Sequence, residues 1–231
     1  MKTLNFYFDY VSNNAYLAWY QLDKLCQAVD INVEPRPVLF AGLLNAHGNV
    51  GPAEIPAKRT WMLKNILRKC ALNDVPISAP IHHPFNPLLA LRVSCFDVDI
   101  KTRRRLIDAL FKAVWLDRLH ISDPDLVGKI VQDVGLDAER VLAWARSPEA
   151  ANVLRRQTDE AVEKGVFGIP SMLIEDELFF GYDDFPFIEQ YIQGRDPLDA
   201  RELKQWELAE LLPSSVRKIV NHGPKTKGGT P

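Results

Sequence analysis

The sequence predicts an α/β fold in which two groups of strands are separated by a long helical segment. An aromatic-rich run at residues 3–8, an amphipathic stretch and a second apolar run at 31–40 form a strand–helix–strand unit. From about Pro56 to Lys164 nearly every periodic signal is helical, and strands return only afterwards. We therefore expect one sheet whose strands come from both ends of the sequence.

The first elements follow from apolar spacing. After a break at residues 9–14, apolar side chains recur at helical spacing and predict a helix of about 15 residues. The strand at 31–40 contains Pro35 and Pro37, which cannot donate ladder hydrogen bonds, so it should lie at an edge or begin late. The small residues of 41–51 indicate a loop.

The last elements are a hairpin and a helix. Residues 171–175 and 178–181 flank the short turn Asp176-Glu177, and 183–193 has helical spacing. The order βαβ, helices, ββα matches a thioredoxin-like core opened after its second strand by a large helical insertion.

The expected domain boundaries follow from this order. The thioredoxin-like domain comprises residues 1–45 and 160–195, and the helical insertion domain comprises 46–159. Residues 196–231 should form one further helix and a disordered tail rich in Gly and Lys.

Composition excludes some partners. The net charge of −2 gives no reason to expect nucleic-acid or membrane binding. The first residues lack the apolar stretch of a secretion signal, and no apolar run approaches the roughly 18 residues of a membrane span. We therefore expect a cytoplasmic protein.

Neither cysteines nor histidines form a recognisable reactive or metal-binding motif. Cys26, Cys70 and Cys95 are widely spaced without a Cys-x-x-Cys pair, so we expect packed free thiols. His82 and His83 are adjacent in a proline-flanked loop without accompanying ligands, so no metal is expected.

The segment 9–18 lies where the first strand ends and the first helix begins. Free backbone N–H groups and the helix dipole favour an anion there, such as a thiolate. Ser12 could donate its hydroxyl proton to that sulfur. The alternative is that Ser12 or Asn13 only caps the helix.

A second candidate is Ile169-Pro170, which follows a glycine-rich turn and opens a strand. A cis bond there would turn the Ile169 backbone groups outward to pair with an extended peptide. An ordinary trans proline is the alternative.

A third, scattered set contains Asn49, Lys58, Phe85-Asn86 and Asp183. Together these residues supply the cation, amides and carboxylate that would hold a zwitterionic tripeptide by its ends. Taken singly, a residue of this kind is more often a solvated loop residue than a ligand contact.

Four motifs occur in order between about Leu4 and Ile192. They are Phe-Tyr-Phe-Asp-Tyr-Val-Ser at 6–12 with Tyr16-Leu17-Ala18, Gly48-Asn49 followed by residues 52–58, Pro84-Phe85-Asn86 with residues 88–92, and residues 165–170 with residues 180–183. Together they resemble the 2-hydroxychromene-2-carboxylate isomerase family, which is related to kappa-class glutathione transferases and periplasmic disulfide oxidoreductases.

The resemblance implies glutathione as cofactor. The residues that it implies for glutathione binding are Ser12, Asn49, Lys58, Ile169, Pro170, Tyr182 and Asp183. Ser12 would lie by the sulfur and act in catalysis. Asn49 and Lys58 would hold the glycine end or backbone, Ile169 the cysteinyl part and Asp183 the γ-glutamyl end.

The resemblance also implies a reaction and an assembly. The reaction opens a hydroxychromene carboxylate to trans-o-hydroxybenzylidenepyruvate by reversible thiolate addition, as a step in aromatic catabolism. Asn13, Phe85 and Asn86 are candidates for the pocket of this small aromatic substrate. A homodimer is expected.

Three positions depart from the family pattern: Asn13 and Gly51 stand where proline is usual, and Asp184 where arginine is frequent. The alternatives are therefore a glutathione transferase for another electrophile, a glutathione-binding protein without activity, or a disulfide oxidoreductase. The last is disfavoured because the start of the helix lacks cysteine.

Overall fold

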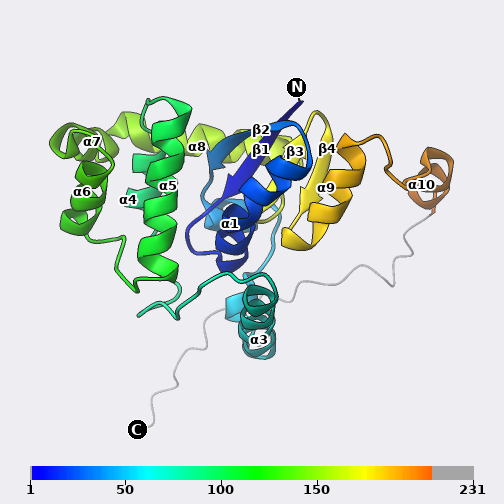
Figure 1. Ribbon diagram of the computed structural model, residues 1–231, viewed down its shortest axis with the longest axis horizontal. Helices are drawn as coiled ribbons and strands as arrows, with labels where there is room; N and C mark the ends of the chain where they lie inside the picture. Colours follow the sequence, from blue (N-terminus) through cyan, green and yellow to red (C-terminus); the bar gives the residue numbers. More distant parts are fainter. Residues whose placement is uncertain (1, 210–231) are drawn as a thin grey trace, which may run out of the picture. The chain divides into compact units, whose positions relative to one another are not determined.

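The computed structural model describes residues 2–209 (Figure 1). The chain forms two compact units, one up to Arg195 and one from Asp196 onward. The second unit contains α10 (Ala200–Glu207), as expected, whose first turn is capped by the side chain of Asp199. The tail expected beyond α10 lies outside the described residues.

A four-stranded sheet with the order β2-β1-β3-β4 forms the centre of the first unit. Its strands are β1 (Lys2–Phe8), β2 (Ile31–Pro37), β3 (Ser171–Ile174) and β4 (Glu177–Phe180). β1 pairs in parallel with β2 and antiparallel with β3, so strands from both ends of the sequence share one sheet. The expectation that Pro35 and Pro37 place their strand at an edge is confirmed.

Helices fill the segment between β2 and β3, as predicted. The helices of the first unit are α1 (Asn13–Ala28), α2 (Phe40–Ala46), α3 (Pro56–Leu72), α4 (Leu88–Ser94), α5 (Ile100–Trp115), α6 (Pro124–Asp133), α7 (Ala138–Ala145), α8 (Pro148–Glu163) and α9 (Phe185–Ile192), with the 3-10 turns η1 (Pro52–Glu54) and η2 (Tyr182–Asp184). In Figure 1, α4 to α7 gather to the left of the sheet and α9 lies to its right, and α5 and α9 both contact α1.

The prediction of a loop at residues 41–51 is wrong for the first half of this segment, because α2 occupies Phe40–Ala46. Its small residues allow close packing on α8: a Cβ on Gly42 would lie 2.9 Å from Cγ2 of Thr158. The Thr158 hydroxyl also accepts a hydrogen bond from the backbone N–H of Leu39 at 3.0 Å. Contacts with a distant helix therefore select the helical state over the loop that composition favours.

The inserted helices and the sheet share one core. Phe111 of α5 is buried against the rings of Phe8, Tyr10 and Trp19, with centroid distances of 5.5, 4.7 and 6.2 Å. These rings belong to β1, the turn after it and α1. Packing on α5 therefore fixes the point where β1 passes into α1.

We predict that Phe111→Ala lowers the free energy of unfolding by about 3–5 kcal/mol, because it leaves a cavity among these rings. Urea denaturation monitored by circular dichroism measures the effect. Leu67→Ala is the control, since Leu67 is 59% exposed on α3, and a change within about 0.5 kcal/mol is expected for it. Equal losses in the two variants would contradict the shared core.

Candidate active site

The turn between β1 and α1 is built on the side chain of Asp9. Its carboxylate accepts hydrogen bonds from the backbone N–H of Val11 at 3.2 Å and of Phe40 at 3.0 Å. The Asp9 carbonyl also accepts from the Ser12 N–H at 3.1 Å. Asp9 therefore joins the turn to the start of α2.

Two side chains from the inserted segment bind the carbonyls of this turn. Trp115 Nε1 donates to the carbonyl of Tyr10 at 2.9 Å, and His83 Nε2 lies 2.8 Å from the carbonyl oxygen of Val11. The conformation of the turn thus depends on α5 and on the loop before α4.

Ser12 is the N-cap of α1, and its hydroxyl oxygen accepts from the Ala15 N–H at 3.1 Å. The capping interpretation is therefore confirmed. A hydroxyl that accepts one hydrogen bond can still donate its proton. Within residues 2–209, the backbone N–H groups of Asn13 and Asn14 have no hydrogen-bond partner. The amino end of α1 can thus offer an anion two N–H groups and one hydroxyl proton.

A cavity of about 570 Å³ lies against this helix end. Of the residues expected from the sequence, the cavity is lined by Ser12, Asn13, Asn49, Lys58, Phe85 and Ile169. These residues come from widely separated segments, so the fold brings together most of the predicted site. The volume lies within the range of small-molecule sites.

Ile169 contributes backbone groups to this cavity. The Ile169–Pro170 bond is cis, as predicted. In the described part of the chain, neither the N–H nor the carbonyl of Ile169 has a hydrogen-bond partner. Both groups therefore remain available for an extended peptide, as in strand addition.

Four expected residues do not line the cavity. Asn86 accepts a hydrogen bond from the Leu88 N–H at 3.0 Å near the start of α4. Pro170 binds the N–H of Gly181 through its carbonyl. Tyr182 and Asp183 belong to η2 and line a separate hollow.

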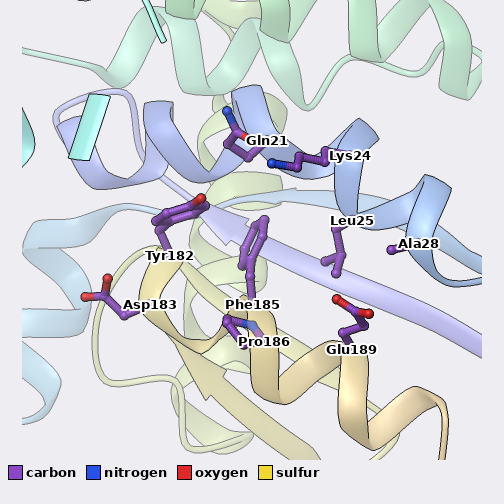
Figure 2. Close-up of a pocket in the computed structure, with 9 residues that line it drawn as sticks. All are labelled: Gln21, Lys24, Leu25, Ala28, Tyr182, Asp183, Phe185, Pro186 and Glu189. Carbon is purple, nitrogen blue, oxygen red and sulfur yellow. The ribbon is translucent and has the colours of Figure 1, made fainter. Parts of the chain in front are cut away.

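This hollow of about 330 Å³ lies between α1 and the η2–α9 segment. Figure 2 shows the side chains of Tyr182 and Phe185 extending toward α1, with Asp183 at one end. Asp183 pairs with Lys69 of α3 at 2.5 Å, and the Tyr182 hydroxyl donates to Asn73 at 2.6 Å. The roles of Tyr182 and Asp183 in glutathione binding stay predictions.

Sequence reasoning missed several residues of the cavity wall. Asp9, His83, Phe167 and Phe180 line it, and each lies in or beside one of the four motifs. Phe167 and Phe180 are 42% and 43% exposed, and their ring centroids are 4.8 Å apart. Their position within the motifs was the signal that could have found them.

Burial raises the pKa of Asp9 and of all three cysteine thiols. Burial raises the pKa of Asp9 to about 7, although backbone N–H donors oppose the shift. Burial likewise raises the pKa of the Cys70 thiol to about 11 and of the Cys95 thiol to about 12, and it raises the pKa of Cys26. None of these thiols lines the cavity, so they supply no thiolate to it.

Two absences hold for the part of the chain that the structure describes. No group of three or more His, Cys, Asp or Glu side chains is arranged to hold a metal ion. No helix is long and apolar enough to cross a bilayer.

A protein-family model described as a DSBA-like thioredoxin domain matches residues 3–193. The chain belongs to the DSBA-like thioredoxin domain family. The predicted thioredoxin-like fold with a helical insertion is thereby confirmed.

Within this family, the chain is similar to proteins named 2-hydroxychromene-2-carboxylate isomerase. It is 29% identical to the one from Sphingobium xenophagum over 193 residues, which is 83% of this chain and 98% of that protein. It is also 26% identical over 184 residues to human glutathione S-transferase kappa 1, covering 73% and 79% of the two chains. Both similarities agree with the expected family.

Solved structures share the fold. A 2-hydroxychromene-2-carboxylate isomerase superposes with a TM-score of 0.76 at 24% identity, covering 90% of this chain and all of that one. The cytosolic disulfide reductase DsbM of Pseudomonas aeruginosa with GSH gives a TM-score of 0.54 at 16% identity, covering 89% and 100%.

We predict that Asp9 makes the protein less stable as the pH rises from about 4 to about 7. The carboxyl keeps its proton up to about pH 7 when folded but loses it near pH 3.9 when unfolded. Rising pH therefore favours unfolding, and the contribution is complete below pH 4 and lost above pH 7. Asp9→Asn should flatten this decline in urea denaturation. Asp30→Asn, the control at an exposed position, should lose stability with rising pH as the wild type does. A decline in Asp9→Asn as large as in the wild type would contradict the prediction.

Proposed function

We propose that the chain is a glutathione-dependent isomerase of 2-hydroxychromene-2-carboxylate-type substrates in the catabolism of aromatic compounds. One observation carries the proposal: the free amino end of α1, with Ser12, faces a cavity that contains no thiol of the chain. Such a site suits a thiolate that is brought by a cofactor. The isomerase names of the relatives support the reaction class.

The residues of the cavity fit the parts of glutathione. Ser12 and the N–H groups of Asn13 and Asn14 would meet the sulfur, and the unpaired backbone of Ile169 would meet the cysteinyl peptide. Lys58 is exposed and forms no ion pair within the described residues, so its ammonium can bind a carboxylate. Asp183 fits less well because Lys69 already binds it outside the cavity.

Bound glutathione would supply a nucleophilic thiolate for reversible addition to a conjugated substrate. The chain would hold that thiolate in its ionised state through the Ser12 hydroxyl and the amino end of α1. Phe85, Phe167 and Phe180 would pack on an aromatic ring and exclude water from it.

A second candidate is a kappa-like glutathione transferase acting on another electrophile. Relatives with that name cover 73–87% of this chain at 23–26% identity, and the same thiolate would serve both reactions. The homodimer remains a prediction.

Turnover with purified protein tests the proposal. Hydroxychromene carboxylate should isomerise rapidly with glutathione and slowly without it, while conjugation of a chloronitrobenzene should be slower and insulin should not be reduced. Efficient conjugation without isomerisation would favour the transferase. Glutathione binding without any turnover would indicate a binding protein.

Ser12→Ala should raise the pKa of the bound thiol by roughly one to two units, since hydrogen bonds to charged groups contribute about 1.5–3 kcal/mol. Turnover at pH 7 should fall by about 10- to 100-fold and recover in part at higher pH. Pre-steady-state and steady-state pH–rate profiles measure this.

Ser147→Ala is the matched control, because Ser147 caps α8 through the Ala150 N–H at 3.2 Å and does not line the cavity. Both variants should lose about 1 kcal/mol of stability, but only Ser12→Ala should change the profile. An unchanged profile would leave Ser12 as a helix cap alone.

Lys58→Ala should raise KM for glutathione by about tenfold and leave kcat nearly unchanged. Its contact with a charged end of glutathione is the same in ground and transition states. Lys64→Ala, also exposed on α3 but outside the cavity wall, should have no effect. Loss of kcat at saturating glutathione in Lys58→Ala would show that the assigned role is wrong.

A further inference from the structure

The hydrogen bond between His83 and Val11 fixes the tautomer of the imidazole. His83 Nε2 lies 2.8 Å from the carbonyl oxygen of Val11. A carbonyl oxygen only accepts, so Nε2 must carry a proton. In the neutral ring, Nδ1 then keeps its lone pair and is the basic nitrogen. Nδ1 has no hydrogen-bond partner among residues 2–209.

The ring is held beside the amino end of α1. It packs against Trp115 and Phe85, with centroid distances of 5.8 and 6.3 Å, and it lines the 570 Å³ cavity. Val11, its hydrogen-bond partner, directly precedes Ser12. A fixed imidazole ring whose basic Nδ1 has no partner within residues 2–209 thus lines the same cavity as the proposed thiolate site.

The other carboxylates around the ring are less suited to take a proton from a substrate. Asp9 is buried and both of its oxygens face backbone N–H groups, and Glu54 Oε1 accepts from the Gly51 N–H at 2.8 Å. Lys58 is a cation. Trp115 at the end of α5 packs on the ring, and the nearby Lys112 forms an exposed ion pair with Asp117.

We infer that His83 is the general base that opens the cyclic hemiketal of a 2-hydroxychromene-2-carboxylate, an inference that rests on the proposed function. Nδ1 takes the proton of the C2 hydroxyl, and the electron pair of that O–H bond forms the C2 carbonyl. The bond from C2 to the ring oxygen breaks, and its pair stays on the aryl oxygen as a phenolate. The imidazolium then returns the proton to that oxygen, so the step is balanced without any further reactant.

His83→Gln tests proton transfer separately from positioning. The glutamine amide can still donate to the Val11 carbonyl but cannot accept a proton at neutral pH. We expect kcat to fall about 100-fold or more, the affinity for glutathione measured by calorimetry to stay within twofold, and the kcat dependence between pH 5 and 8 to weaken. Asp9 also titrates near pH 7, and its contribution should remain in the variant.

His82→Gln is the matched control. His82 is adjacent in sequence but exposed, packs on His120 with centroids 5.0 Å apart, and does not line the cavity. It should retain the wild-type kcat and pH profile.

Three results would overturn the assignment to His83. The first is an unchanged kcat and profile in His83→Gln. The second is a loss of kcat accompanied by an equal loss of glutathione affinity, which would indicate a positioning role. The third is a nitrogen-15 NMR spectrum of wild-type protein that shows His83 with its proton on Nδ1. The third result needs no turnover, so it separates failure of this inference from failure of the proposed function.

Discussion

The buried carboxylate of Asp9 joins the two segments between which the cavity opens. It binds the N–H of Val11 in the turn after β1 and the N–H of Phe40 at the start of α2. Removing a carboxylate from water is costly, which is why burial raises the pKa of Asp9 to about 7. These backbone donors offset part of that cost and hold the turn and α2 at a fixed separation. The amino end of α1, whose first N–H groups have no partner within residues 2–209, and the facing cavity wall both depend on this arrangement.

The helical insertion completes the site as well as the core. Phe111 of α5 packs on the Tyr10 ring, and Trp115 of α5 donates a hydrogen bond to the Tyr10 carbonyl. His83 binds the carbonyl of the next residue, Val11. Without the insertion, the carbonyls of Tyr10 and Val11 in the turn would lose these hydrogen-bond partners. The insertion therefore supports the helix end at which we propose that a thiolate binds.

Apolar periodicity was sufficient to predict the order of strands and helices along the chain and the helical insertion. The four motifs supplied five of the six expected residues that line the cavity, all but Asn13. Other features depended on contacts that sequence does not show. α2 forms because Gly42 packs closely on Thr158, which lies more than a hundred residues away. His83 was weighed only as a metal ligand, since nothing in its local sequence reveals that Val11 is its partner. Likewise, the motif containing Asp183 could not show that an ion pair holds it outside the cavity.

The central claim is that the amino end of α1 and Ser12 stabilise a thiolate that the chain itself does not carry. Ultraviolet absorbance of the thiolate, followed against pH with glutathione bound and S-methylglutathione as blank, tests this claim most directly. The account predicts that the bound thiol ionises at least one pH unit below the pKa of about 8.5 of a free cysteine thiol. A bound thiol that ionises no more readily than free glutathione, or a chain that binds no glutathione, would contradict it.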